Sequence, residues 1–374
     1  MNDYDVLGSF GRGKRALHQN GRQSAEHDST GGFPHQNEGF FYGKRLKKDM
    51  FNQTGVLVAA AGTVLNHSEL EKLQFHGIEL REDDVEAAGS FAGKMMEQSE
   101  LINQGVRKIS PIFEEMRMTK QVPLLEIRQN ILPIIHQTTE QPNLFGLFAS
   151  LQSKDDYTYR HNIGVGVIAT LIGRWLGLTE AELSQLTMAA TLHDIGKVKI
   201  PLEILNKPGK YTEEEFSMMK RHAVYGYQIL KETVGINHRQ ALVALQHHER
   251  QDGSGYPLGI GGNKIDFFSR IVAVADIFHA MTSKRVYRDA SPFYETLKQM
   301  ENNAFGVLDP RIVRLFLDKV MGMLVGNEVL LTNGKNGTIV MVHPQDPMHP
   351  LVHIDGTFLD LRSEPGVHIQ QVVI

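Results

Sequence analysis

The sequence predicts a mainly α-helical protein, with a mixed α/β segment before the helical core and a small β segment after it. Apolar residues recur at three- and four-residue steps between residues 144 and 320, which is typical of packed helices. Short apolar runs broken by Gly and Asn lie at 40–80 and again after Gly326, and these favour strands. We therefore expect the 374 residues to divide into four regions: 1–38, 39–138, 139–322 and 323–374.

The first two regions are expected to be a tail and a small module. Residues 1–38 are rich in Gly, Ser, Asn, Gln and His, which is typical of a disordered tail. The stretch 49–65, "DMFNQTGVLVAAAGTVL", predicts two strands joined by a turn, and "SELEKLQFHG" predicts a short helix that stops at Gly77. Residues 84–138 carry helical periodicity, with Pro133 expected to kink or end a helix. We interpret residues 39–138 as a regulatory or dimerising module, in which nothing resembles a catalytic centre.

The helical core and the C-terminal segment follow from periodicity and turn signals. Thr179 and Glu182 have the spacing of a capping box at a helix start. After Gly326 the pairs Asn333–Gly334 and Asn336–Gly337 predict hairpin turns in a small β-domain. Apolar positions predict the core helices at 161–176, 180–192, 213–233, 238–249 and 266–282.

Composition narrows the chemistry. A formal charge of −4 gives no sign of a basic surface for a nucleic-acid polymer. The chain has no cysteine, so disulfides and thiolate metal sites are excluded. Any metal must be held by Asp, Glu and the 17 histidines, and these ligands suit Fe, Mn or Zn. No stretch approaches the roughly 18–20 apolar residues of a membrane span, and a cytoplasmic protein is the simplest expectation.

Histidines and aspartates recur through the core at positions where a charge is costly. Asp194 follows "TMAATLH" and Asp276 lies within "RIVAVADIF", and burying a carboxylate costs several kcal/mol unless it is paired or bound to a cation. A lone His on an apolar helix face is more often a core residue, but this set would suit two metal ions that share an Asp. Two cations about 3.5–4 Å apart can clamp the attacking and leaving oxygens of a phosphodiester displacement. The candidate ligands are His161, His193, Asp194, His222, His247, His248 and Asp276.

Two motifs make the interpretation specific. "HDIGK" at 193–197, followed by "HHERQDGSGYPLGIGGNKI" at 247–265, strongly resembles the HD-GYP family, a branch of the HD phosphohydrolases that hydrolyses cyclic di-GMP. The resemblance covers roughly residues 145–320, about half of the chain. It implies an HD-domain helical catalytic core with a binuclear or trinuclear centre, commonly of iron or manganese.

The resemblance also implies roles for individual residues. One ion would be bound by His161, His193, Asp194 and Asp276, and the other by Asp194 as a bridge with His222, His247 and His248. Some members use a Glu four residues before the first His for a third ion; Tyr157 stands there, so we expect two ions. Lys197 matches the lysine that contacts the scissile phosphate. Arg285 and Arg288 match basic positions that hold the other phosphate.

The loop after the paired histidines and one departure from the family complete the expected site. The family usually has an acid where this chain has His279, which we expect near the site but not as a ligand. Glu249 and Asp252 are expected to orient the imidazoles and the loop. Gly253 and Gly255 would permit positive φ and Pro257 would fix the chain's exit. Tyr256 is equally a packing residue or a ligand contact. In the family this loop is linked to diguanylate cyclase partners.

The expected reaction is hydrolysis of cyclic di-GMP to pGpG, with further cleavage to GMP left open. A hydroxide bridging two ions would attack phosphorus while Lys197 neutralises a non-bridging oxygen. Two alternatives remain: hydrolysis of another nucleotide such as cyclic GMP-AMP, and a sensor that binds cyclic di-GMP without cleaving it.

Overall fold

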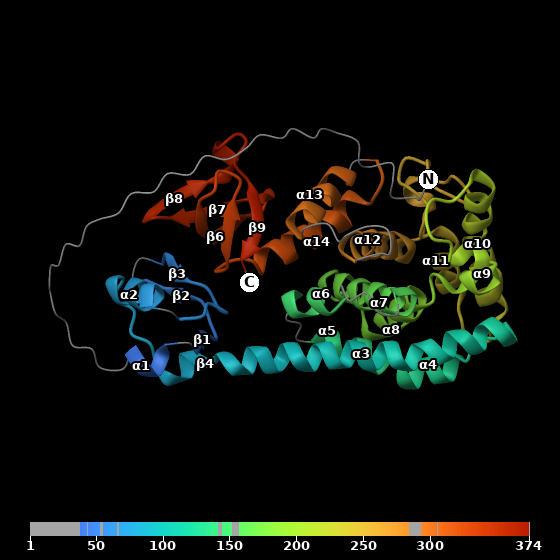
Figure 1. Ribbon diagram of the computed structural model, residues 1–374, viewed down its shortest axis with the longest axis horizontal. Coiled ribbons are helices and arrows are strands. Elements are labelled where there is room, and N and C mark those ends of the chain that lie inside the picture. The colour runs from blue at the N-terminus through green and yellow to red at the C-terminus, as the bar shows by residue number, and fades with distance from the viewer. Residues whose placement is uncertain are drawn as a thin grey trace.

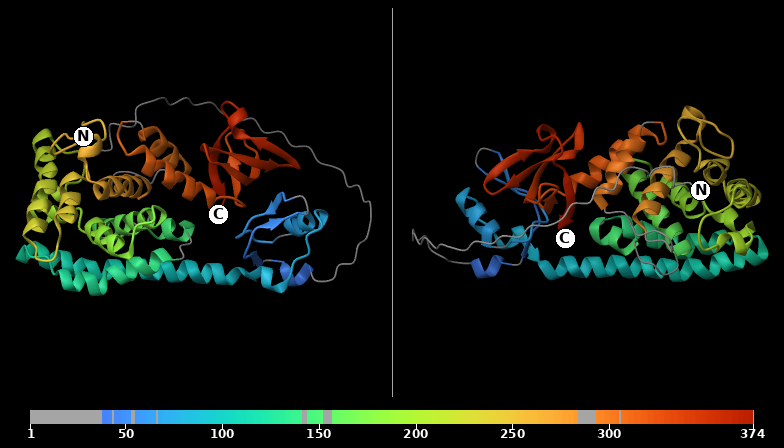
Figure 2. Two further views of the ribbon diagram at one scale, coloured as in Figure 1. Left: turned by 180° about the vertical axis from the view of Figure 1, so that it is seen from behind. Right: turned by 45° about the horizontal axis from the view of Figure 1, so that its top comes forward.

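A computed structural model describes residues 38–373, except for 43, 53–54, 66, 141–143, 152–156, 284–292 and 305. The predicted tail at 1–38 therefore lies almost wholly outside the described residues. A helical bundle forms one end of the molecule, and a small N-terminal module and a C-terminal sheet lie beside each other at the other end (Figures 1 and 2). This arrangement confirms the mainly α fold with a mixed segment before it and a β segment after it.

The N-terminal module is built from short strands and short helices, of which α2 is the longest. β2 pairs with β3 and β1 pairs with β4, both antiparallel, and Leu46, Leu65 and Leu73 are buried between them. Gly77 has φ +68° just after the helix, so the strands, the helix and its end at Gly77 were predicted correctly. The elements are α1 (Glu38–Phe41), β1 (Lys44–Leu46), β2 (Met50–Phe51), β3 (Leu57–Ala59), α2 (His67–Phe75), η2 (Glu82–Asp84) and β4 (Val85–Ala87).

A single long helix connects this module to the bundle. α3 (Ala88–Thr119) has 32 residues, which makes it about 48 Å long, and it runs along one side of the molecule (Figure 1). The chain then forms α4 (Leu124–Asn130) and α5 (Leu132–Glu140). The break falls just before Pro133, which occupies the first turn of α5, where a missing N–H costs little. The expectation that Pro133 would end or kink a helix is confirmed.

The bundle surrounds two helices that are buried on nearly all sides, α7 and α12. The five helices expected from periodicity correspond to α7, α8, α10, α11 and α12. The capping box is present: the Thr179 hydroxyl accepts from the Glu182 N–H at 3.3 Å, and the Glu182 carboxylate accepts from the Thr179 N–H at 3.0 Å. The elements are α6 (Leu144–Leu151), α7 (Tyr157–Trp175), α8 (Glu180–Thr191), η3 (Ile195–Lys199), α9 (Leu202–Leu205), α10 (Glu213–Glu232), α11 (His238–Gln246), η4 (Gly262–Lys264), α12 (Phe267–Thr282), α13 (Phe293–Asn303) and α14 (Pro310–Gly322).

The C-terminal sheet is antiparallel with strand order β8-β7-β6-β5-β9. Asn333 and Gly334 turn the chain between β5 and β6, with Gly334 at φ +81°. The second predicted turn is wrong, because Asn336 and Gly337 begin β6. Gly337 is needed for close packing instead, since a Cβ there would come within 2.5 Å of Val352 Cγ1. The strands are β5 (Glu328–Leu331), β6 (Asn336–His343), β7 (Asp346–Ile354), β8 (Thr357–Asp360) and β9 (Ile369–Val373), with η5 (Leu361–Ser363) between the last two.

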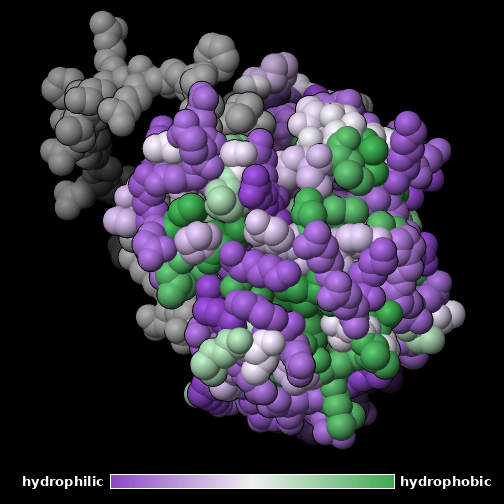
Figure 3. All heavy atoms as spheres, turned by 90° about the vertical axis from the view of Figure 1, so that its right-hand side faces the viewer, coloured by the Kyte–Doolittle hydropathy of each residue, from purple (hydrophilic) through white to green (hydrophobic). Residues whose placement is uncertain are grey.

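The described helices can be compared with the length and apolar character of a membrane span. Within the described ranges, no helix has both the length and the apolar character needed to cross a bilayer. The end of the molecule near α9 and α10 is mostly hydrophilic, with hydrophobic side chains in separate groups between polar ones (Figure 3).

Candidate metal centre

The seven candidate ligands come together inside the bundle, although they are spread over more than a hundred positions of the chain. They come from α7, from the ends of α8 and α11, from α10 and from α12. Each is at most 7% exposed. Nitrogen and oxygen atoms lie within 4.8 Å of one another in two groups: Asp194, His222, His247 and His248 in one, and His161, His193 and Asp276 in the other.

Asp194 lies between the two groups, and each of its oxygens faces one of them. Oδ2 is 3.4 Å from His193 Nε2 and 3.7 Å from His161 Nε2. Oδ1 is 3.3 Å from His222 Nε2 and 3.8 Å from His247 Nε2. A carboxylate with this placement can bridge two cations.

Backbone carbonyls fix which nitrogen of three imidazoles carries the proton. A carbonyl can only accept, so each Nδ1 donates and the Nε2 lone pair is left facing Asp194. Burial lowers the pKa of His222 to about 4, so that ring is neutral at neutral pH. The contacts join Nδ1 of His193 to the Ala190 oxygen (2.7 Å), Nδ1 of His222 to the Met219 oxygen (2.7 Å), and Nδ1 of His247 to the oxygens of Val243 (3.1 Å) and Ala244 (3.0 Å).

The resulting electrostatics favour a cation. His222 Nε2 and His247 Nε2 lie 3.3 Å apart, and both face Asp194 Oδ1. Because neither nitrogen carries a proton, the lone pairs of both nitrogens and of the carboxylate oxygen point at the same small region. Burial opposes protonation of His193, but Asp194 outweighs it and raises the His193 pKa, so a proton can neutralise that side in the absence of metal. A divalent ion in either group would satisfy the acceptors that face it, and the donor set fits iron, manganese or zinc.

Both buried aspartates are ionised. Burial alone would raise their pKa values. The Lys197 ammonium and the surrounding imidazoles instead hold the pKa of Asp194 well below its usual range. A hydrogen bond from His161, whose Nε2 lies 3.1 Å from Asp276 Oδ1, holds the pKa of Asp276 well below its usual range. Each metal group therefore has a negatively charged oxygen.

An open cleft lies over Asp194. It has a volume of about 330 Å³ and is lined by both Asp194 and Lys197, whose Oδ2 and Nζ atoms lie 2.5 Å apart. Helix α3 lines the cleft with Phe113, Glu114 and Arg117. Residues 39–138, in which no motif resembles a catalytic centre, thus contribute side chains to the lining of this cleft. Helical periodicity shows which face of a helix is apolar, but not which other helices that face will contact. The sequence therefore could not predict that α3 would line this cleft.

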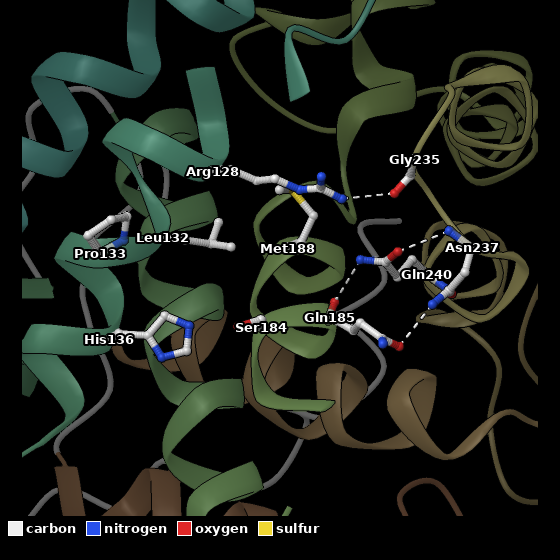
Figure 4. A pocket seen from close by; sticks show the side chains of 10 residues that line it. All are labelled: Arg128, Leu132, Pro133, His136, Ser184, Gln185, Met188, Gly235, Asn237 and Gln240. Atoms are coloured by element: carbon white, nitrogen blue, oxygen red, sulfur yellow. Dashed lines mark hydrogen bonds between the residues drawn. The ribbon is translucent and has the colours of Figure 1, made fainter. Parts of the chain in front are cut away.

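A larger cavity, of about 520 Å³, lies elsewhere between α4, α5, α8 and the chain before α11 (Figure 4). Its amides bond to each other and to backbone: Asn237 Nδ2 donates to Gln185 Oε1 at 2.8 Å, and Gln240 Nε2 donates to the Gln185 carbonyl at 3.2 Å. None of the candidate metal ligands lines it. The smaller cleft over Asp194 is therefore the candidate site.

His279 lies against the centre, where the sequence placed it. Its Nδ1 is 3.1 Å from Nδ1 of His161 and 3.1 Å from the Ser283 hydroxyl, and it belongs to neither metal group. Its position allows it to orient the His161 ring. Arg285 and Arg288, expected to hold the second phosphate, lie outside the described residues.

The loop after the paired histidines is braced by its acids. Glu249 is 2% exposed and accepts from the Leu258 N–H at 2.7 Å and the Ile260 N–H at 3.0 Å. Asp252 is exposed and accepts from the N–H and the hydroxyl of Ser254. Both acids therefore hold the loop, and these contacts give them no part in orienting an imidazole.

Tyr256 and the loop glycines have mainly packing roles. The Tyr256 ring stacks on His248 with centroids 4.6 Å apart, and a cis peptide bond joins it to Pro257. Gly253 has φ +80°, as expected. The same expectation for Gly255 is wrong: its φ is not positive, and it is small because a Cβ would lie 2.4 Å from the His248 carbonyl oxygen.

The fold and the site define a class: a helical-bundle protein with a buried histidine–aspartate cluster that fits divalent metal binding. Comparison with known proteins agrees, since residues 146–312 match the family model described as HD domain. Residues 146–312 are therefore similar to HD domains.

Three relatives illustrate the match. The chain is 32% identical to the cyclic di-GMP phosphodiesterase PA4108 of Pseudomonas aeruginosa, covering 73% of this chain and 65% of that protein. It is 39% identical to the cyclic di-GMP phosphodiesterase response regulator RpfG of Xanthomonas campestris, covering 52% of each chain. It is 37% identical to the 3'3'-cGAMP-specific phosphodiesterase 3 of Vibrio cholerae, covering 50% of this chain and 40% of that protein. The chain thus spans less than two thirds of each relative's length.

Proposed function

We propose that this chain is a metal-dependent phosphodiesterase that hydrolyses cyclic di-GMP to pGpG. The observation that carries the proposal is the position of Asp194, whose two oxygens face separate imidazole groups below an open cleft. The relatives named as cyclic di-GMP phosphodiesterases support the choice of substrate.

The proposed ligand sets are the two groups joined by Asp194. His161, His193, Asp194 and Asp276 would hold one ion, and Asp194, His222, His247 and His248 would hold the other, with iron or manganese as the metal. When bound, two such ions would supply a hydroxide nucleophile at neutral pH and stabilise charge on the phosphate.

The chain's own residues would position and neutralise the substrate. The Lys197 ammonium, which lines the cleft, would approach a non-bridging phosphate oxygen and offset the negative charge that develops there. The backbone carbonyls that bind Nδ1 of the imidazoles keep their rings oriented. In this scheme the leaving 3′ oxygen takes its proton from solvent.

Substitution of Asp194 by Asn tests the proposal. The amide keeps the shape of the side chain but loses the charge that two cations need, so we expect metal content to fall and turnover to drop by more than roughly 100-fold. Asp318→Asn, which changes a partly exposed carboxylate on α14, is the matched control and should keep both. An Asp194→Asn protein that retains its metals and its turnover would refute the mechanism.

A second substrate is favoured by a specific finding, the similarity to a 3'3'-cGAMP-specific enzyme. The metal ligands would act on either phosphodiester in the same way, so they do not distinguish the two substrates. Initial rates measured with cyclic di-GMP and with cyclic GMP-AMP decide which is the substrate. A higher kcat/KM for cyclic GMP-AMP would change the substrate and keep the reaction class. Tight binding of cyclic di-GMP without any product would instead identify a sensor.

A further inference from the structure

The last turn of α3 forms one wall of the cleft over Asp194, and it contributes a cation there. Arg117 lines this cleft together with Lys197. Arg117 lies outside the HD-GYP motifs, and no sequence pattern around it predicts a place in the site. Any role for Arg117 in binding the cyclic dinucleotide rests on the function proposed above.

Among the described residues, the other charged side chains of the cleft do not pair with Arg117. Four charged residues line the cleft. Lys197 and Asp194 bind each other, and Glu114 accepts a hydrogen bond from the Tyr159 hydroxyl. The Arg117 guanidinium makes no hydrogen bond or ion pair with any residue that the structure describes. A half-buried guanidinium has five donors, and its preferred partner is a carboxylate or a phosphate.

Asn162 gives a second and independent indication that the cleft receives a polar ligand. It follows His161 on α7, lines the same cleft and is 0% exposed. Neither its amide nitrogen nor its amide oxygen has a hydrogen-bond partner within the described part of the chain. Buried amides are nearly always hydrogen-bonded, so a ligand or an ordered water must supply the missing partners.

The end of α3 is also held in place relative to Lys197. Lys120, the residue after α3, donates from Nζ to the carbonyl oxygen of Val198 at 3.2 Å. Val198 is the neighbour of Lys197 in η3. Arg117 and Lys197 therefore belong to segments that are joined by a hydrogen bond beside the cleft.

We propose that Arg117 binds the second phosphodiester of a cyclic dinucleotide whose scissile phosphodiester lies at Asp194 and Lys197, as a contact additional to those that the family resemblance implies for Arg285 and Arg288. The planar guanidinium fork matches two phosphate oxygens. The long helix that begins at the N-terminal module thus takes part in choosing the substrate.

The test compares Arg117→Gln with the wild-type chain on two substrates. Cyclic di-GMP has two phosphodiesters, whereas bis(4-nitrophenyl) phosphate has one and needs no second anion site. We expect KM for cyclic di-GMP to rise roughly 10- to 100-fold, the scale of one charged hydrogen-bonded pair, with kcat nearly unchanged. The kcat/KM for bis(4-nitrophenyl) phosphate should stay within about twofold of wild type, because Arg117 is expected to contribute only to uniform binding of the second phosphate.

Two further variants serve as controls. Arg107→Gln removes the same charge from an exposed position of α3, where Arg107 pairs with Glu100, and should leave both substrates unaffected. Arg117→Lys keeps the charge without the fork and should give an intermediate KM.

Other outcomes would overturn the assignment in distinguishable ways. An unchanged KM for cyclic di-GMP in Arg117→Gln, or an equal loss on both substrates, would show that Arg117 does not bind the second phosphate. A wild-type, metal-loaded chain that cleaves neither substrate would refute the proposed function itself, and the role of Arg117 with it.

Discussion

Three imidazoles around Asp194 are oriented by the backbone of their own helices. His193, His222 and His247 each donate Nδ1–H to a carbonyl three or four residues earlier. This bond needs no other element, so each ring is preset as a metal ligand by the local helix. The local helix therefore sets the tautomer and the orientation of each of these three rings. Tertiary packing then brings the rings together.

The buried imidazoles predict how the metal-free protein responds to pH. The pKa of buried His222 is about 4, compared with 6.5 for an ordinary His. This difference corresponds to about 3 kcal/mol in the free energy of unfolding. The folded-state pKa is depressed, so this stability is present above pH 6.5 and is lost as the pH falls toward 4. Burial also lowers the pKa values of His247 and His248, which adds in the same direction.

Urea unfolding of chelator-treated protein between pH 7.5 and pH 4 measures this effect. The free energy of unfolding should fall as the solution is acidified, and a His222→Gln variant should show a decrease smaller by about 3 kcal/mol. Identical pH profiles for the two proteins would mean that His222 is not buried in neutral form.

Individual site residues differ in how far the sequence could predict them. The apolar flanks of Asp194 and Asp276 indicated buried charge, and the structure brings both to the same centre. Arg117 and Asn162 were not predicted as site residues, because helical periodicity does not show which cleft a polar side chain will face. Gly255 was given the wrong reason, because the sequence cannot distinguish a glycine needed for positive φ from one needed for close approach.

At the scale of elements, the centre depends on how closely η3 packs against α10. A Cβ on Gly196 would lie 1.8 Å from the His222 carbonyl oxygen and 2.5 Å from the Gly226 nitrogen. Both contacts are to backbone, which cannot move aside. Gly196 therefore sets the approach of Asp194 to His222.

Gly196→Ala should separate the two elements. We expect a loss of about 3 kcal/mol or more in the free energy of unfolding, since the clash is with backbone, together with weaker metal binding. Gly322→Ala is the matched control: its Cβ would meet nothing within 4 Å at the end of α14, so it should gain up to about 1 kcal/mol. Urea unfolding measures both, and a Gly196→Ala protein as stable as wild type would contradict this packing.

Element types were largely predictable, and local turn chemistry less so. Helical periodicity located α7, α8, α10, α11 and α12 because each has an apolar face long enough to show the repeat. Asn336–Gly337 was assigned to a turn because the same dipeptide occurs in hairpins. Its place in β6 depends on the contact of Gly337 with β7, which is tertiary information.

At the scale of the whole molecule, α3 connects the N-terminal module to the helical bundle, which were predicted as separate regions. It starts beside the N-terminal module and ends at the cleft (Figure 1). The module also lies beside the C-terminal sheet, because Val58 and Ala59 of β3 line the same small cavity as Thr338 and Ile339 of β6. Domain boundaries at 38, 138 and 322 remain predictions, as do a homodimer and a diguanylate cyclase-type partner.

The central claim is that seven side chains from across the bundle hold two cations that share Asp194. Anomalous diffraction from a crystal of anaerobically purified protein, recorded on both sides of the iron and manganese absorption edges, tests it most directly. We predict two peaks, one beside each oxygen of Asp194, with Asp276 bound to the ion on the His161 side and the 247–248 pair bound to the other. The absence of any peak between these residues, or peaks that leave Asp194 unbound, would contradict the claim.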